Sequence, residues 1–322
     1  MCNTVDSPQL TEDFSVSKLP EVFRIEPASS CNLRCIHCPT GLWKNKSLGV
    51  MSEETFCKIF LILQEVKPRV VVMYHGGEPL INRHVFKWIK EIKKIGIGFV
   101  KVVSNGMLLK HKKVIQMIDS GLDSIEFSLD GKSAEENAFI RKGCDFSLVI
   151  KNIKGLISLK KEKSSAVPKI FITCTQFIDD NHVENESEQE IPSFIKREFT
   201  GEFDQEVEYK KNFAYFWPGL RGTKSEKVYE IEKTFRNNDM VSTYCPHIVE
   251  TISIRWNGDV VPCCYDLTSN YVIGNVLESP IEDIWNNNKF KKLRKSIFDK
   301  KYVSLCQNCH VLSPTHFLAI SQ

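Results

Sequence analysis

The chain has 322 residues, of which 42% are hydrophobic and 26% are charged, and its formal net charge is +3 at pH 7. This composition is typical of a folded globular protein with one catalytic domain and a smaller appendage, and the small net charge does not indicate a nucleic-acid partner. No apolar run reaches the roughly 18 residues of a membrane helix and no signal peptide opens the chain, so we expect a cytoplasmic protein without membrane contact.

Short apolar runs alternate with helical patterns over residues 21–176. We predict strands at Val22–Ile25, Val70–Tyr74, Phe99–Val103, Ser124–Leu129 and Lys169–Gln176, with helices opened by Ser52 and near residues 83–95, 110–119 and 145–163. Continuously apolar strands are typical of strands buried on both faces. A repeated strand–helix order indicates parallel strands with right-handed crossovers, so we expect an α/β fold, open or curled into a partial barrel.

The second half of the chain is less regular. The acidic stretch 179–190 predicts a boundary, and residues 191–240 predict one more strand and a substrate-facing segment. Asn257-Gly258 predicts a two-residue hairpin turn between residues 252–256 and 259–263, which would pair Cys263 with Ile252. Apolar residues from Ile281 to Ile297 predict one helix that covers this hairpin.

The 12 cysteines of the chain form tight groups at its two ends. Thiols in the cytoplasm stay reduced, so clustered cysteines there indicate metal binding or catalysis. Residues 31–38 read CNLRCIHC and follow a predicted strand. Three thiolates in one loop can hold three corners of a [4Fe-4S] cube and leave one iron open. A zinc site and a group of inert thiols are the alternatives.

CNLRCIHC resembles the C-x3-C-x2-C signature of the radical S-adenosylmethionine (SAM) superfamily. The resemblance implies that Cys31, Cys35 and Cys38 hold a [4Fe-4S] cluster whose open iron binds SAM. It also implies reductive cleavage of SAM to a 5′-deoxyadenosyl radical, which abstracts a hydrogen atom from the substrate. The implied fold is a partial (β/α)6 parallel barrel over residues 21–210, preceded by an N-terminal arm at residues 1–20.

Further motifs resemble the SAM-binding elements of this superfamily, and each follows a predicted strand. His75-Gly76-Gly77-Glu78-Pro79 is similar to the GGEP element, whose glycines let the backbone approach the SAM amino group. His37 stands where the family usually has an aromatic residue near adenine. The residues that the resemblance implies as SAM contacts are His37, Gly76, Gly77, Glu78, Pro79, Ser104, Asn105, Ser128 and Asp130. Plain turns and an exposed histidine are the alternatives. Arg141 is a further candidate for the SAM carboxylate or an anionic substrate.

The second cysteine group consists of Cys245, Cys263, Cys306 and Cys309. Four thiolates suit either a closed iron–sulfur cluster or structural zinc. The spacing resembles the SPASM/twitch extension of radical SAM enzymes, which implies an auxiliary [4Fe-4S] cluster domain, hairpin plus helix, over residues 211–322. Cys264 could replace Cys263 as a ligand, because neighbouring residues of a strand point to opposite faces.

The resemblance therefore implies SAM and two [4Fe-4S] clusters as cofactors, and from these we predict an oxidoreductase. The first hypothesis is a dehydrogenase that oxidises a sugar, cyclitol or similar small molecule, with the auxiliary cluster accepting an electron. The second is a maturase of a ribosomally made peptide, for which Cys144 or Cys174 could return a hydrogen atom. The third is a metal-stabilised binding protein without turnover. We expect flavodoxin or ferredoxin as the electron donor.

Overall fold

A computed structural model describes residues 10–42, 48–176, 191–213, 242–307, 309, 311 and 312. The boundary predicted at residues 179–190 and most of the segment predicted as substrate-facing lie outside these residues. No helix within the described ranges is both long and apolar enough to cross a membrane.

The fold is built on one nine-stranded sheet with the order β6-β5-β4-β3-β2-β1-β7-β8-β9. Neighbours from β6 to β7 pair in parallel, and β8 and β9 add antiparallel strands at one edge. The strands are β1 (Val22–Ile25), β2 (Val70–Val72), β3 (Phe99–Ser104), β4 (Ser124–Ser128), β5 (Lys169–Gln176), β6 (Val207–Phe213), β7 (Thr251–Ile254), β8 (Asp259–Val261) and β9 (Gly274–Asn275). The α/β fold class is confirmed: β1 to β6 form the parallel core, and β7 extends the parallel set to seven strands.

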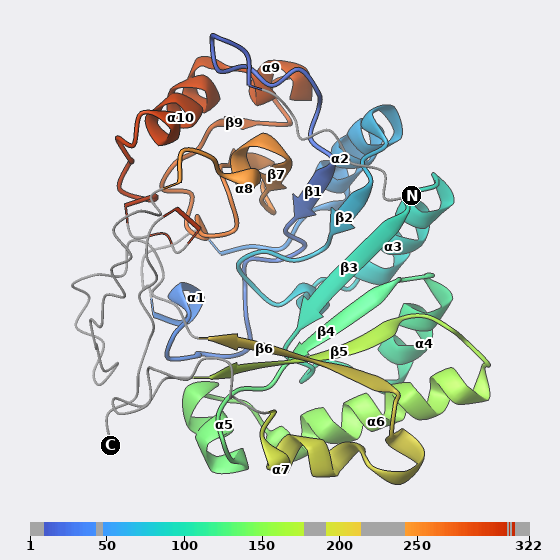
Figure 1. Ribbon diagram of the computed structural model, residues 1–322. Coiled ribbons are helices and arrows are strands. Elements are labelled where there is room, and N and C mark those ends of the chain that lie inside the picture. The colour runs from blue at the N-terminus through green and yellow to red at the C-terminus, as the bar shows by residue number, and fades with distance from the viewer. Residues whose placement is uncertain are drawn as a thin grey trace, which may run out of the picture.

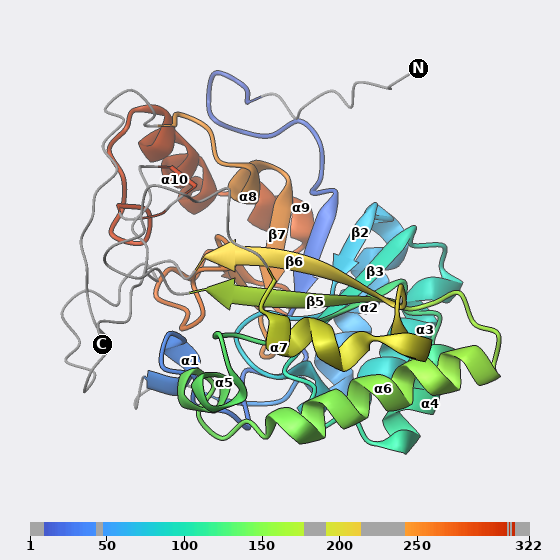
Figure 2. The same ribbon diagram turned by 60° about the horizontal axis from the view of Figure 1, so that its bottom comes forward.

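The described residues form ten helices, and the longer ones between consecutive parallel strands cover one side of the sheet (Figures 1 and 2). They are α1 (Pro39–Leu42), α2 (Glu53–Val66), α3 (Val85–Lys94), α4 (His111–Asp119), α5 (Ala134–Ile140), α6 (Phe146–Glu162), α7 (Ser193–Lys196), α8 (Pro246–Val249), α9 (Ile281–Trp285) and α10 (Asn288–Phe298). Short 3-10 turns are η1 (Pro79–Ile81), η3 (Arg197–Phe199) and η4 (Gly201–Phe203).

The two faces of the parallel strands differ in chemistry. Phe23 and Ile25 are fully buried in the apolar core beneath the helices. Arg24 and Glu26 alternate with them and therefore point to the opposite face. The prediction of strands that are apolar on both faces is wrong for this inner face, because its polar side chains surround a cavity.

The hairpin is confirmed, but its predicted register is wrong by one residue. Ser253 pairs with Val261 and Ile254 with Val260, so Cys263 does not pair with Ile252. The loop has three residues rather than two: Arg255 accepts from the Gly258 amide and donates its own amide to Asp259. Gly258 alone in this loop has positive φ, at 86°. This geometry is a type I turn followed by a left-handed glycine, which shifts the pairing.

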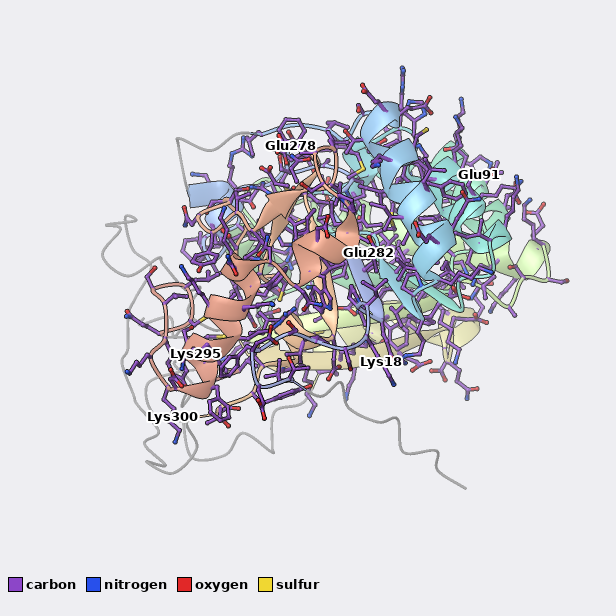
Figure 3. All side chains as sticks on the ribbon, turned by 90° about the horizontal axis from the view of Figure 1, so that it is seen from above. Lys18, Glu91, Glu278, Glu282, Lys295 and Lys300 are labelled. Carbon is purple, nitrogen blue, oxygen red and sulfur yellow. The ribbon has the colours of Figure 1, made fainter. Side chains whose placement is uncertain are left out.

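The single helix predicted over the hairpin is two helices, α9 and α10. Asn286 is the C-cap of the first helix, and Asn287 is the N-cap of the second, since its side chain accepts from the amides of Lys289 and Phe290. Arg294 joins the two helices: it is 1% exposed and donates to the carbonyls of Trp285 and Ile248. Figure 3, seen from above, shows α10 with Lys295 at one side of the molecule and α3 with Glu91 at the other.

The C-terminal hairpin continues the same sheet as the parallel strands. Residues 22–25 of β1 pair with residues 70–72 of β2 on one edge and with residues 251–254 of β7 on the other. The domain boundary predicted at residue 210 falls inside β6. The amino-terminal and carboxy-terminal regions are therefore joined through the backbone of β1.

Candidate active site at the carboxyl ends of the parallel strands

One cavity collects most of the predicted site residues. It lies where the parallel strands end, which is where ligands of such sheets bind. Its lining includes residues 31, 35 and 38 from the loop after β1, residues 74–78 after β2, and residues from the ends of β3 and β4. The lining residues are Cys31, Leu33, Cys35, His37, Cys38, Thr40, Tyr74, His75, Gly76, Gly77, Glu78, Val103, Ser104, Asn105, Ser128, Arg141 and Leu267.

The three cysteines of the first group face this cavity together. Cys31 accepts from the Leu33 amide at 3.4 Å, and the Asn105 side-chain amide lies 3.9 Å from its sulfur. Burial raises the pKa of Cys35 to about 12, with further contributions from Cys38 and Cys31. Burial also raises the pKa of Cys31. Coordination to iron needs the thiolate form, so these thiols must lose protons when a cluster binds.

The two glycines after β2 are required by close packing. A Cβ atom on Gly77 would lie 2.3 Å from the Ala28 carbonyl oxygen and 2.5 Å from that of Ser30. The Gly76 amide donates to a Glu26 carboxylate oxygen at 2.9 Å. This turn therefore holds the segment that leads into Cys31, in addition to the predicted approach to a ligand.

Glu78 is buried and its carboxylate accepts three hydrogen bonds. The donors are the Leu80 amide at 3.0 Å, the Ser104 hydroxyl at 2.8 Å and the Asn105 amide at 2.8 Å. All three are neutral, and no described lysine or arginine forms an ion pair with this carboxylate. Burial raises the pKa of Glu78. A bound cation, such as the ammonium group of SAM, would stabilise its ionised form.

Asp130 does not line the cavity, although the resemblance implied a SAM contact. It is fully buried, and its carboxylate lies 2.7 Å from an Arg141 guanidinium nitrogen and 3.9 Å from His37 Nε2. Arg141 does line the cavity, and its Nε is buried without a hydrogen-bond partner among the described residues. Asp130 therefore orients Arg141, which faces the space that a carboxylate ligand would occupy.

Several residues of the cavity were not predicted from the sequence. Thr40 donates its hydroxyl hydrogen to the Gly76 carbonyl, and Tyr74 and His75 immediately precede the two glycines. His75 Nε2 lies 3.2 Å from the Asp266 carbonyl oxygen, which can only accept, so Nε2 carries the proton. Burial lowers the pKa of His75 to about 4. Tyr74 and His75 could have been identified from the sequence, because they directly precede the glycine turn at the end of a predicted strand.

Cys144 and Cys174 are buried in the apolar core and do not line the cavity. Cys174 is fully buried on the helix-facing side of β5 together with Ile172. Their surroundings match the structural role that buried cysteines usually have.

The second cysteine group is also gathered in space. Burial raises the pKa of Cys306 to about 12, and repulsion from the thiols of Cys309 and Cys245 adds to this. Cys263 is similarly affected by Cys264, Cys306 and Cys245. Cys245 precedes α8, Cys263 follows β8, and the last two cysteines lie in consecutive turns.

Arg24 lowers the pKa of Cys264 against the larger effect of burial, and Cys264 in turn raises the pKa of Cys245 and Cys309. The adjacent Cys263 is the thiol that neighbours Cys306. Leu267, three residues after Cys264, lines the cavity of the first cysteine group. The C-terminal region thus contributes a wall to that cavity.

Within the described ranges, no three side chains of His, Cys, Asp or Glu surround a single metal ion. A [4Fe-4S] cube takes each thiolate on a different iron, so its ligands spread around the cube. The donor set suits the cofactors: soft thiolates bind iron–sulfur clusters. The buried Glu78 carboxylate and Arg141 Nε match the opposite charges of an amino acid such as SAM.

Two family descriptions match the chain. The Radical SAM superfamily matches residues 25–185, and an iron–sulfur cluster-binding domain, SPASM, matches residues 245–310. The first match contains Cys31, Cys35 and Cys38, and the second spans Cys245 to Cys309.

Similar proteins cover nearly the whole chain at low identity. The tungsten-containing aldehyde ferredoxin oxidoreductase cofactor-modifying protein of Pyrococcus furiosus is 23% identical over 91% of this chain and 88% of its own. BtrN in complex with AdoMet and 2-DOIA superposes with a TM-score of 0.59 at 18% identity, covering 91% of this chain and 93% of BtrN. Streptococcus suis SuiB bound to precursor peptide SuiA superposes with a TM-score of 0.54 at 15% identity, covering 96% of this chain and 77% of SuiB. These likenesses show a shared fold.

Proposed function

Since the chain belongs to the radical SAM superfamily and carries a C-terminal SPASM iron–sulfur domain, we propose that this radical SAM enzyme is an oxidoreductase of the dehydrogenase type. Its substrate is a sugar, a cyclitol or a comparable small molecule. With a [4Fe-4S] cluster held by Cys31, Cys35 and Cys38, bound SAM would supply a 5′-deoxyadenosyl radical for hydrogen abstraction. A cluster held by the second cysteine group would supply an acceptor for the remaining electron, while a proton leaves the substrate to water.

The observation that carries the proposal is the shared cavity. It brings all three thiols of the CNLRCIHC loop together with strand-end polar groups, and its wall includes Leu267 from the cysteine-rich C-terminal region. Leu267 follows Cys263 by four residues, so the second cysteine group is connected to this wall of the cavity, on the side toward which we propose that an electron leaves the substrate.

We assign the first cluster to Cys31, Cys35 and Cys38, and the auxiliary cluster to Cys245, Cys263, Cys306 and Cys309. The SAM-binding wall consists of His37, Gly76, Gly77, Glu78, Ser104, Asn105 and Ser128, with Asp130 acting through Arg141. Pro79 was also predicted as a SAM contact, but it is buried in η1 and does not line the cavity. Glu78 would pair with the ammonium group and Arg141 with the carboxylate. A flavodoxin or ferredoxin would supply the electron in the cytoplasm.

The peptide maturase remains the second candidate, because the SuiB structure with precursor peptide SuiA superposes over most of this chain. The two candidate functions make different demands on substrate size. Products from a panel of aminocyclitols and sugars, compared with short peptides, would separate them.

The basic test is anaerobic reconstitution with iron and sulfide, followed by SAM and dithionite. We expect iron and sulfide near eight of each per chain, and 5′-deoxyadenosine as a product. Cys35→Ala should lose product formation and about half of the iron. Cys57→Ala, at an exposed position of α2, is the matched control and should retain both. No 5′-deoxyadenosine above background in the intact chain would contradict the proposal and favour a non-catalytic binding protein.

A further inference from the structure

A layer of charged side chains lies on the inner face of the sheet, beneath the cavity. Residues two apart on a strand point to the same face. Val103 of β3 and Ser128 of β4 line the cavity, so Lys101 and Glu126 lie on the same face, one step nearer the amino ends of these strands. We call Arg24, Lys101, Glu126 and Lys210 the charged floor.

Glu126 is the single carboxylate of this floor. Lys101 Nζ lies 2.6 Å and Lys210 Nζ 2.9 Å from the same oxygen, Oε2. Burial acts to raise the pKa of Glu126, but the hydrogen bonds and charges of Lys101 and Lys210 outweigh it and bring the value to about 2. One negative charge is therefore shared by two ammonium groups.

Arg24 adds a third cation, for which the described part of the chain provides no carboxylate partner. It is 8% exposed, its Nη1 donates to the Ser253 hydroxyl at 3.3 Å, and its Nε is buried without a partner there. Arg255 of the same face, by contrast, has Glu26 at 3.0 Å. A buried guanidinium without a counter-charge is costly. The charged floor as a whole carries three cations against one carboxylate.

Tyr74 connects the charged floor to the cavity. It is one of the cavity's lining residues, and Lys101 Nζ lies 6.0 Å from the centre of its ring. Burial raises the pKa of its phenol, and the charges of Arg24, Glu126 and Lys210 also act on it. None of the four floor residues lines the cavity itself, so Tyr74 lies between the cavity and these cations, and an anionic group would have to pass its ring to reach them.

We propose that the charged floor binds an anionic group of the substrate, a carboxylate or a phosphate, with Arg24 and Lys101 as its main partners. The inference rests on the proposed function and narrows its substrate class to an acid or a phosphorylated small molecule. Arg24 can offer Nε and Nη donors together, which suits the paired oxygens of either group. The excess of two positive charges would accommodate a phosphate dianion.

The test uses the reconstituted enzyme with saturating SAM and no reductant, so that the SAM site is filled and no turnover occurs. Thermal unfolding is followed while phosphate, or acetate as the carboxylate probe, replaces chloride at constant ionic strength. A ligand that binds only the folded state raises Tm in a saturable way. We expect saturation with phosphate, and an apparent Kd at least tenfold weaker in Arg24→Gln and in Lys101→Gln.

Lys93→Gln is the matched control, because Lys93 pairs with Asp123 at 2.7 Å with similar exposure but lies on α3 and is not part of the charged floor. It should respond to phosphate as the intact chain does. The proposal is overturned if neither anion raises Tm of the intact chain, or if both floor variants keep its apparent Kd. A loss of iron in Arg24→Gln without a change in apparent Kd would overturn it as well, and would assign Arg24 to the cysteine site. Formation of 5′-deoxyadenosine is measured separately, so either proposal can fail alone.

Discussion

Gly77 occupies a position where no side chain can be placed without moving backbone. Its nearest neighbours are carbonyl groups of residues 28–30, directly before the first cysteine. We expect Gly77→Ala to lower the free energy of unfolding by about 3 kcal/mol, the upper range for overpacking, and to reduce iron in the first site. Chemical denaturation and iron analysis measure the two effects.

The control for this change is Gly155→Ala. Gly155 lies inside α6, and a Cβ atom added to it would meet no described atom within 4 Å, so alanine there should stabilise the helix by about 0.5–1 kcal/mol. Equal stability of the two variants would show that the close packing at Gly77 has no energetic consequence.

Cys263 and Cys264 are adjacent, and only one is expected to bind the auxiliary cluster. Both thiols lie near the other three cysteines of the group, since Cys263 interacts with Cys245 and Cys306, and Cys264 interacts with Cys245 and Cys309. We assign Cys263, because its spacing is the one that resembles the SPASM extension. We predict that Cys263→Ser reduces iron from about eight to about four per chain, and that Cys264→Ser retains about eight. Iron analysis and electron paramagnetic resonance distinguish the outcomes, and the reverse result would exchange the assignments.

The sequence predicted which residues form the site better than it predicted the contacts between them. The spacing of Cys31, Cys35 and Cys38 was sufficient to place them together, because a short loop limits their separation. The pairing of Asp130 with Arg141 was not predictable, since it depends on how α5 turns back toward β4. Arg24 stood inside an apolar run, and only the sheet shows that it faces inward.

The turn after β2 contacts the C-terminal region through one histidine. The neutral form of His75 is favoured by burial, which gives the folded state a pKa of about 4 against 6.5 for an ordinary histidine. Between these values the unfolded chain binds more protons, so stability falls as the pH falls. The expected loss between pH 7 and pH 5 is about 2 kcal/mol.

Anaerobic urea unfolding across this pH range tests the expectation. His75→Gln keeps a donor for the Asp266 carbonyl and cannot titrate, so its stability should depend less on pH. His111→Gln, at an exposed position of α4, should keep the full dependence. An unchanged slope in His75→Gln would mean that another group causes the dependence.

Elements with strong periodic patterns were predicted almost to the residue, as β1 and β5 show. Four short helices, α1, α5, α7 and α8, were missed. For α5 the signal was present: Ser133 accepts from the Glu136 amide, and Glu136 Oε2 accepts from the Lys132 amide. This is close to a capping box, a local pattern that identifies helix starts. The two-helix ending was hidden because apolar spacing continues across Asn286 and Asn287.

For the molecule as a whole, we predict that β1 and β7 unfold together. The Glu26 amide donates to the Ile254 carbonyl at 2.9 Å, and the Val22 amide donates to Glu250 at 3.1 Å. Phe23→Ala should cost about 3–5 kcal/mol, since Phe23 is fully buried in the core, and should accelerate hydrogen exchange in β7 as well as in β1 and β2. Exchange followed by mass spectrometry provides the rates.

Leu61→Ala is the control, because Leu61 is 61% exposed on α2 and should leave all three strands protected. Unchanged exchange in β7 of the Phe23→Ala variant would mean that the C-terminal region unfolds as a separate unit.

The parallel order of six strands could be predicted from their alternation with helices. The position of the C-terminal hairpin could not, because nothing local in residues 251–261 specifies which edge they join. The position is determined by β1, which pairs with β2 along one edge and is left with a free edge that β7 occupies.

The pairing of β7 with β1 limits how chains of this kind can be recombined. A C-terminal half taken from another protein would have to offer a strand in register with residues 22–25, a carbonyl in place of Asp266 and an apolar side chain in place of Leu267. A chimera that preserved only the cysteines would leave β1 with an open edge and the cavity with a missing wall. A recombined protein should therefore fold only where β1 and the C-terminal region that pairs with it come from the same parent protein.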